Sequence, residues 1–176
     1  MSQRRIYVAS SWRNNQQPKV VEVLRSQGYD VYDFHNPAKD NNGFSWEEVD
    51  KNWESWTPRH FANKVTTDTI AAEGFAYDKA ALDGCDTLVL LLPCGKSAHL
   101  EAGYAAGQGK QVIVVLHWDG FEPELMYLLA DAIVTNVDEM LAFLRDNPRK
   151  CGAYLSEPED DMYRRFTSLL RTNVQF

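Results

Sequence analysis

Two uninterrupted apolar runs mark the middle of the sequence, at Leu88–Leu92 and at Val112–Leu116. Runs of this length, without polar alternation, are typical of central strands in a parallel sheet that helices cover on both faces. A segment rich in small residues, Ala98–Gly109, lies between the runs and predicts a helix. Neither run is long enough to span a bilayer. The region therefore predicts a strand–helix–strand unit of a parallel α/β sheet and no membrane partner.

The same alternation continues on both sides of this unit. On the N-terminal side we expect a strand at Arg5–Ala9, a helix at Gln16–Gln27 that stops at Gly28, and a strand at Tyr29–Phe34. Further along we expect a helix at Thr66–Gly84 with Ile70, Phe75, Ala80, Ala81 and Leu82 on its apolar side, strands at Asp86–Leu92, Lys110–Leu116 and Asp131–Thr135, and helices at Pro123–Ala130, Val137–Arg145 and Asp160–Leu170. About five strands alternating with helices indicate a doubly wound sheet.

The length of 176 residues fits a single domain, residues 1–176, with two additions to the alternating pattern. The first is an insertion at about 36–64, which is polar yet holds Phe44, Trp46, Trp53, Trp56 and Phe61. Long insertions are often lids or binding loops, whereas the alternative is that these aromatic residues pin the insertion onto the body. The second is a C-terminal tail from about residue 148.

Charge and cysteine content exclude several classes of function. The formal net charge is −7, which argues against a protein that binds polymeric nucleic acid. The three cysteines, Cys85, Cys94 and Cys151, form no CxxC pair, and the four histidines lack metal-binding spacing. The N-terminus carries no apolar signal region. We therefore expect a cytoplasmic protein without a metal or another cofactor, which can still bind a small anion through local donors.

Three segments should meet at the carboxyl edge of such a sheet: Ser10–Arg13, Pro93–Glu101 and Trp118–Met126. In the second segment, Gly95 allows a ligand to approach the backbone, Lys96 adds a positive charge and Ser97 is a candidate helix cap. The amides at a helix start favour anions. No Walker or dinucleotide-binding motif is present, so an ordinary helix start remains the alternative.

Two carboxyl groups are candidates for chemistry. Glu101 lies about one turn into the helix after the central strand, among alanine, glycine and leucine. A carboxylate in so apolar a setting is a candidate nucleophile or acid–base group, although the helix dipole alone also favours it there. Asp78 lies on the helix that leads into the central strand, and its alternative is an ordinary surface aspartate.

Four segments of the sequence, in this order, carry a resemblance to a known family. They are Ile6–Trp12 (IYVASSW), Tyr77-Asp78 followed by Asp86, His99–Ala105 (HLEAGYA) followed by Gly109-Lys110, and Pro123–Met126 (PELM). Together they resemble the nucleoside 2-deoxyribosyltransferase family and its nucleotide N-glycosidase relatives, over most of residues 5–135. The Glu–x–Gly–Tyr–Ala block is the most specific piece.

The resemblance implies a flavodoxin-like parallel sheet and a small-molecule nucleoside or nucleotide as substrate. It implies that Glu101 is the nucleophile at C1′ of the sugar, that Tyr7 holds this glutamate, and that Asp78 faces the base. It also implies a homo-oligomer in which the segment with Glu124 and Met126 completes the site of a neighbouring subunit.

The sequence departs from the family pattern near the substrate. The transferases carry an acidic residue six positions before the glutamate, where this chain has Gly95, and Glu124 replaces an expected asparagine. Ser10, Ser11, Trp12 and Arg13 in the first loop, with Gly95, Lys96 and Ser97, are the expected substrate-binding residues, and their donors would suit a 5′-phosphate. Two alternatives stay open: an NAD glycohydrolase-like enzyme and a non-catalytic module that binds small nucleotides.

Overall fold

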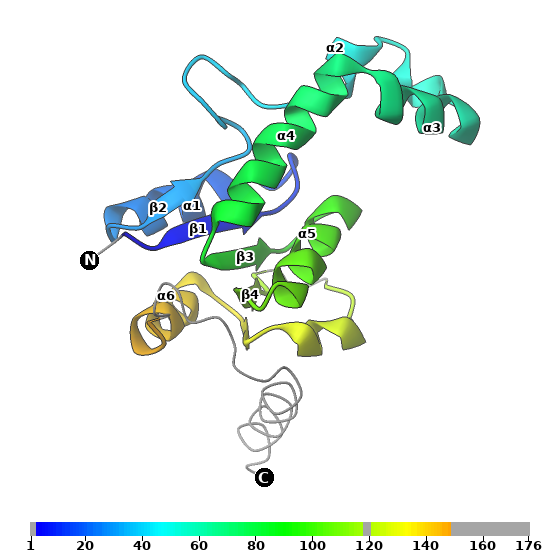
Figure 1. The fold of residues 1–176 in the computed structure, drawn as a ribbon. Helices are drawn as coiled ribbons and strands as arrows, with labels where there is room; N and C mark the ends of the chain where they lie inside the picture. The colour runs from blue at the N-terminus through cyan, green and yellow to red at the C-terminus, as the bar shows by residue number, and fades with distance from the viewer. Residues whose placement is uncertain (1–2, 118–120, 149–176) are drawn as a thin grey trace.

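A five-stranded, all-parallel sheet in the order β2-β1-β3-β4-β5 lies at the centre of the computed structural model, which describes residues 3–117 and 121–148 (Figure 1). The strands are β1 (Arg5–Ala9), β2 (Asp30–Tyr32), β3 (Thr87–Leu91), β4 (Gln111–Val115) and β5 (Ala132–Val134). The first strand lies inside the sheet, between β2 and β3, and the chain winds outward from it in both directions. This order is that of flavodoxin-like folds and confirms the predicted doubly wound sheet.

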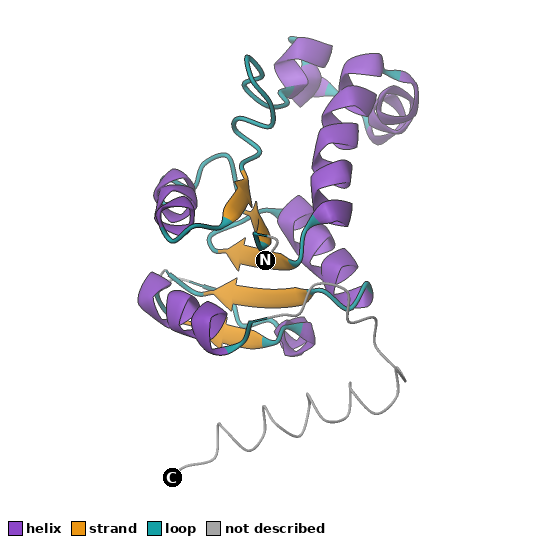
Figure 2. Ribbon diagram, turned by 60° about the vertical axis from the view of Figure 1, so that its left-hand side comes forward, coloured by secondary structure: helices purple, strands orange, loops and turns teal. Residues whose placement is uncertain are grey.

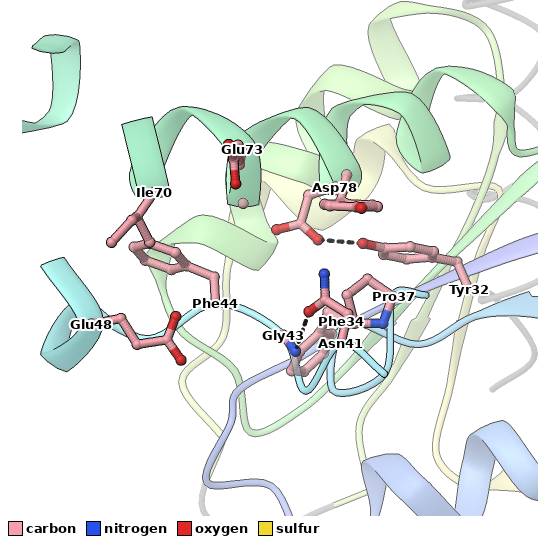
Figure 3. A pocket seen from close by; sticks show the side chains of 12 residues that line it. Tyr32, Phe34, Pro37, Asn41, Gly43, Phe44, Glu48, Ile70, Glu73 and Asp78 are labelled. Atoms are coloured by element: carbon pink, nitrogen blue, oxygen red, sulfur yellow. Dashed lines mark hydrogen bonds between the residues drawn. The ribbon is translucent and has the colours of Figure 1, made fainter. Parts of the chain in front are cut away.

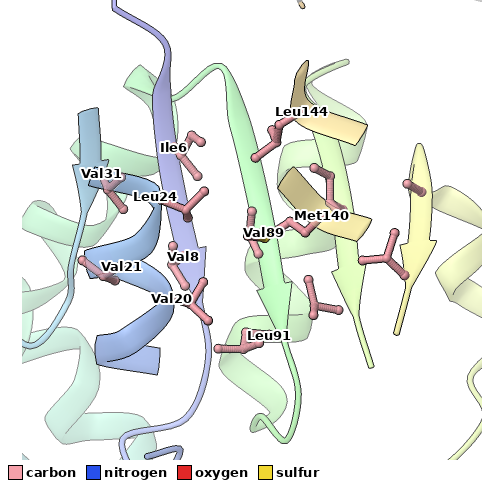
Figure 4. Packing of buried hydrophobic residues seen from close by; sticks show 14 residues of the cluster. Ile6, Val8, Val20, Val21, Leu24, Val31, Val89, Leu91, Met140 and Leu144 are labelled. Carbon is pink, nitrogen blue, oxygen red and sulfur yellow. The ribbon is translucent and has the colours of Figure 1, made fainter. Parts of the chain in front are cut away.

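Helices cover both faces of the sheet. They are α1 (Gln17–Ser26), α2 (Trp46–Val49), α3 (Pro58–Thr67), α4 (Thr69–Gly84), α5 (Lys96–Gly107) and α6 (Val137–Asp146), with 3-10 turns η1 (Trp53–Ser55) and η2 (Leu125–Leu129). On one face, α1 and α6 bury Leu24, Met140 and Leu144 against Val8 and Val89 (Figure 4). The other face carries the end of α4, α5 and η2.

The alternation of side chains along β1 decides what each face receives. Ile6 and Val8 point to the face of α1 and α6, whereas Tyr7 and Ala9 belong to the buried cluster on the side of α5. Tyr7 is only 1% exposed. Tyr7 therefore lies beneath α5, on a strand that pairs with β2 on one side and with β3 on the other.

Beyond the sheet, α2, η1, α3 and the start of α4 form a projection that Figures 1 and 2 show standing away from the body. We call residues 44–68 the aromatic lobe. Within it, the Trp46 ring meets the rings of Phe44, Trp56 and Phe61 edge-on, with centroids 4.7, 5.7 and 5.7 Å away. The main contacts of α2 and α3 outside the lobe are with α4. Four of the five aromatic residues thus pack on one another, and Phe44 also packs on α4 at Gly74.

Helix α4 begins later than the sequence predicts. Asp68 caps it by accepting hydrogen bonds from the backbone N–H groups of Ile70 and Ala71, at 3.0 and 3.2 Å. Thr66 and Thr67, which were expected in this helix, are the last residues of α3 instead. The insertion accordingly extends to Thr67, three residues past its expected end.

The apolar side expected for α4 is wrong in three positions. Phe75 is 66% exposed, Ile70 is 37% exposed and Ala80 is also exposed, whereas Ala71 and Leu82 are the buried residues of the helix. The physical reason for Ile70 and Phe75 is that much of α4 projects past the sheet (Figure 2), whereas Ala80 lies on the exposed side of the last turns.

Helix α5 also begins differently. Its N-cap is Gly95 and its first residue is Lys96, so the expectation that Ser97 caps the helix is wrong. The predicted helix at Pro123–Ala130 is the 3-10 turn η2. Trp118, Cys151, the expected helix at Asp160–Leu170 and almost all of the tail lie outside the described residues. Within the described ranges, no helix is both long and apolar enough to cross a membrane.

Candidate active site

Glu101 and Tyr7 form the centre of the site. Helix α5 follows β3 and packs against both β3 and β1, which brings Glu101, in the second turn of the helix, to the hydroxyl of Tyr7. Burial, followed by the nearby charge of Asp78, raises the pKa of Glu101 to about 7, although a hydrogen bond with Tyr7 acts in the opposite direction. A carboxyl group with such a pKa exchanges its proton near neutral pH, as acid–base and nucleophilic groups of enzymes do.

A second carboxyl–tyrosine pair lies beside the first. The Tyr32 hydroxyl donates a hydrogen bond of 2.8 Å to Oδ1 of Asp78, and the rings of Tyr32 and Tyr7 stack with centroids 5.2 Å apart. Burial raises the pKa of Asp78, and the hydrogen bond from Tyr32 opposes that shift. The interpretation of Asp78 as an ordinary surface aspartate is therefore wrong. We call Tyr7, Tyr32, Asp78 and Glu101 the tyrosine–carboxyl cluster.

Both tyrosines of the cluster remain protonated. Burial first, and then the neighbouring carboxylates, raise the pKa of Tyr7 and of Tyr32. Each hydroxyl is consequently a fixed hydrogen-bond donor to a carboxyl group. Tyr32 was missed in the sequence because it lies in an ordinary-looking strand; its only signal was a position level with Tyr7 on a neighbouring strand.

A cavity of about 450 Å³ opens next to Asp78, between α4 and the loop after β2 (Figure 3). The rings of Tyr32, Phe34, Phe44 and Tyr77 contribute to its walls. Its polar lining residues are Asn41, Glu48, Glu73 and Asp78. The sequence marked this region only as a candidate lid or binding loop and did not identify Asn41, Glu48 or Glu73.

The two loops expected to bind substrate lie side by side. The Ser10 hydroxyl donates to the carbonyl oxygen of Leu91 at 2.8 Å, and the Asn14 side chain donates to Ser10 Oγ at 3.0 Å and to the Pro93 carbonyl oxygen at 3.2 Å. Asn14 is 4% exposed and ties the loop after β1 to the loop after β3. Ser10 therefore helps to hold the two loops together, and Asn14 is a positioning residue that could not be identified from the sequence.

The remaining donors of these loops face solvent. Ser11 Oγ accepts a hydrogen bond of 3.2 Å from the Arg13 backbone, which shapes the first loop. Arg13, together with Gly95, Lys96 and Ser97 at the start of α5, is exposed. The structure thus brings both expected donor groups to the same edge of the sheet, where β1 and β3 end next to each other.

Trp12 connects the first loop to the loop that leads into the aromatic lobe. Its ring meets Phe34 and His35 edge-on, with centroids 5.3 and 4.3 Å away. Gly43 fits against it closely: a Cβ atom there would lie 2.6 Å from the indole and 2.3 Å from the Phe34 carbonyl oxygen, and the φ of Gly43 is +79°. Trp12 is still 51% exposed.

Met126 lies apart from the tyrosine–carboxyl cluster. It is 63% exposed and lines a second cavity, of about 480 Å³, between α5 and η2, together with Glu124 and His99. No member of the cluster is among the described residues that line this second cavity. Within one chain, the structure therefore does not bring Met126 to Glu101. Among the residues that the structure describes, no group of three potential metal ligands occurs.

Comparison with protein-family models and with curated proteins gave no match. Among solved structures, the chain is similar to a 2-deoxyribosyltransferase from Bacillus psychrosaccharolyticus, with 17% identity and a TM-score of 0.50 over 77% of this chain and 89% of that one. It is also similar to the CMP N-glycosidase BcmB from Clostridium botulinum, with 16% identity and a TM-score of 0.45 over 81% of this chain and 99% of that one. At such identity, the likeness to the deoxyribosyltransferase shows a common fold.

Proposed function

We propose that this protein breaks the N-glycosidic bond of a nucleoside or nucleoside monophosphate, with Glu101 attacking C1′ of the sugar. The observation that carries the proposal is the tyrosine–carboxyl cluster. Its two carboxyl groups have raised pKa values and are each hydrogen-bonded to a tyrosine, and one of them, Asp78, lines an aromatic cavity. Both known proteins compared above act on nucleosides or nucleotides by name, which agrees with this activity.

Glu101 suits the role of nucleophile. Positive charge develops at C1′ as the bond to the base breaks, and a carboxylate beneath that carbon stabilises the charge and can trap the sugar. In the first step an oxygen of Glu101 bonds to C1′, and the electron pair of the C1′–N bond leaves with the base. In the second step water or another base attacks C1′, releases Glu101 and restores the original configuration. Tyr7 orients the attacking carboxylate by its hydrogen bond.

Asp78 suits the role of acid. A leaving base needs a proton on the nitrogen that was bonded to the sugar, and a carboxyl group whose pKa is raised by burial keeps a proton to give. Because the charge of Asp78 raises the pKa of Glu101, the pair holds one proton over a range of pH. The form of the pair that reacts is the one in which Asp78 holds this proton and Glu101 is the carboxylate.

A 5′-phosphate has a place at the paired loops. The side chains of Arg13 and Lys96 carry positive charge, and the exposed start of α5 offers backbone N–H groups at Gly95, Lys96 and Ser97. Ser11 contributes a hydroxyl in the same loop as Arg13, and Trp12 borders the space toward the aromatic lobe. We therefore propose a monophosphate as the preferred substrate.

The test is a chromatographic assay of base release. Wild-type protein, Glu101→Gln and the surface control Glu22→Gln are incubated with nucleosides, deoxynucleosides, their monophosphates and NAD, each with and without a second free base. We expect release by wild type and by the control, and a fall of roughly 10³-fold or more in Glu101→Gln, because the covalent step is lost. A new nucleoside formed only with added base identifies a transferase.

The remaining outcomes of the same assay decide against the proposal. Release of nicotinamide from NAD alone identifies an NAD glycohydrolase. Tight nucleotide binding without turnover identifies a binding module. Equal activity of Glu101→Gln and wild type rules out Glu101 as the nucleophile.

A further inference from the structure

The residues that line the cavity beside Asp78 favour one class of base, although the proposed chemistry does not itself require such a preference. We infer that it holds the base of the substrate and selects bases with an exocyclic amino group next to an unprotonated ring nitrogen, as in cytosine and adenine. Bases with a carbonyl group in that place, such as uracil and hypoxanthine, are disfavoured. The inference rests on the proposed function, because Asp78 belongs both to the cluster and to the cavity wall.

The walls of the cavity fit a flat ring. Tyr32 stands on the side of the cluster, Phe34 lies in the loop after β2, and Phe44 lies across from them at the entrance of the aromatic lobe (Figure 3). Aromatic faces stack on any nucleobase and confer little sequence preference on their own. The choice among bases must therefore come from the polar groups on the rim.

One of these polar groups is oriented by the backbone. Oδ1 of Asn41 accepts a hydrogen bond of 2.9 Å from the N–H of Gly43. The amide nitrogen of Asn41 is thereby turned toward Asp78, into the cavity (Figure 3). This group can only donate. It matches a ring nitrogen that carries a lone pair.

The other polar groups are acceptors. Glu48 comes from α2 and Glu73 from α4, and both line the same cavity as Asn41. Ionised carboxylates accept hydrogen bonds and cannot donate them. An amino group beside a ring nitrogen presents a donor next to an acceptor, which matches a cavity wall that offers both carboxylate acceptors and the amide donor of Asn41. A carbonyl group beside a ring N–H presents the reverse order and would set its oxygen against a carboxylate.

The charge of the residues that line the cavity also favours bases with an amino group. Besides Asp78, which is the acid of the proposed reaction, the carboxylates of Glu48 and Glu73 line the cavity, and no lysine, arginine or histidine is among the described residues that line it. Its potential is therefore negative and favours amino hydrogens, which carry partial positive charge. When a site of this kind receives a ligand without the matching donor, its own polar groups lose their partners and affinity falls.

The experiment compares two double variants that remove the same charge from the same region. Glu48→Gln with Glu73→Gln changes the cavity. Glu47→Gln with Glu54→Gln changes exposed residues of α2 and η1 that do not line it. We measure kcat/KM for base release from deoxycytidine, deoxyadenosine, deoxyuridine and deoxyinosine and from their monophosphates.

For wild type and the control we expect a preference for amino bases of about 10- to 100-fold, the usual effect of one or two charge-assisted hydrogen bonds. In Glu48→Gln/Glu73→Gln we expect that preference to fall to within about threefold, through slower release of cytosine or adenine. The cytosine and adenine substrates separate a one-ring from a two-ring base, and either result supports the inference.

Measuring the binding of free bases tests the base preference independently of the test for base release. Calorimetry with cytosine, adenine, uracil and hypoxanthine is carried out on wild type, on Glu101→Gln and on both double variants. Tighter binding of amino bases that depends on Glu48 and Glu73 supports the inference even if no bond is cleaved. Equal binding of all four bases, a preference for uracil and hypoxanthine, or identical behaviour of the two double variants overturns it while base release can still occur.

Discussion

The proposed function requires Glu101 to be charged, but its charged form destabilises the folded protein. Its pKa is raised from 4.5 to about 7 in the folded protein, chiefly by burial. Between these two values the folded state binds more protons than the unfolded state, so stability falls as pH rises through this window. Above pH 7 the folded protein contains a partly buried charge whose penalty is then fully present. Below pH 4.5 the penalty is absent.

Replacing Glu101 with Gln should therefore stabilise the protein in a pH-dependent way. We expect a gain on the order of 2 kcal/mol at pH 8 and almost none near pH 4.5, since the pKa difference sets an upper limit of about 3 kcal/mol and the site is partly open to solvent. Urea unfolding of wild type and variant across this range measures the difference. Glu22→Gln, an exposed change, should show no such trend. A difference that is constant with pH would contradict the assignment of the raised pKa to Glu101.

The sequence predicted the two carboxyl groups of the tyrosine–carboxyl cluster better than the residues that hold them. Glu101 and Asp78 could be identified because carboxylates are unusual among small apolar neighbours and near a strand end. Tyr32 and Asn14 could not, because their importance depends on which strands are adjacent and which loops touch. Such information arises from contacts between residues far apart in the chain.

At the scale of elements, the closest fit in the aromatic lobe is between Phe44 and α4. A Cβ atom at Gly74 would lie 2.8 Å from Cδ2 and 3.0 Å from Cβ of Phe44. The helix itself would gain from alanine at this position, by up to about 1 kcal/mol. The crowding opposes that gain, because Phe44 is held by Trp46 on its other side.

Gly74→Ala should therefore destabilise the protein by about 1–3 kcal/mol, as overpacking generally does, and shift the fluorescence of the lobe tryptophans. Gly107→Ala is the matched control, because Gly107 also lies in a helix, lines neither cavity, and a Cβ atom there meets nothing within 4 Å. We expect this control to be neutral or slightly stabilising in urea unfolding. If Gly74→Ala were as stable as the control, the packing of the lobe on α4 would not matter for folding.

Element types were largely predictable and element environments were not. The buried strands β3 and β4 could be identified from composition alone, because both faces of a central parallel strand are apolar. The exposure of Phe75 and Ile70 could not, because periodicity shows which side of a helix is apolar and not how far the helix extends beyond the sheet.

At the scale of the whole molecule, exposed apolar side chains lie on the two elements that line the second cavity. Leu125 and Leu100 are each 76% exposed and Met126 is 63% exposed, on η2 and α5, which line that cavity together. Exposed apolar surface of this kind often marks an interface. A second copy of the chain is the occupant that we propose, and it would also bring Met126 to a neighbouring site.

Light scattering coupled to gel filtration tests this proposal. The wild-type protein should elute with a mass that is a multiple of the 20.1 kDa chain. Leu125→Glu should shift the population to the monomer, because burying an unpaired charge at an interface is costly. Lys19→Glu on α1, on the opposite face of the sheet, should leave the mass unchanged. A wild-type monomer at micromolar concentration would contradict an oligomer.

The position of the aromatic lobe along the chain bears on how such a protein can change during evolution. The lobe lies inside the loop that pairing of β1 with β3 closes, between Ile6 and Thr87. Loop closure entropy grows only with the logarithm of length, so removing the lobe from a loop of roughly 80 residues would alter closure by only about 0.3 kcal/mol. Lengthening, shortening or exchange of this segment is thus nearly neutral for assembly of the sheet. Selectivity can diverge there while Tyr7 and Glu101 stay on elements that do not move.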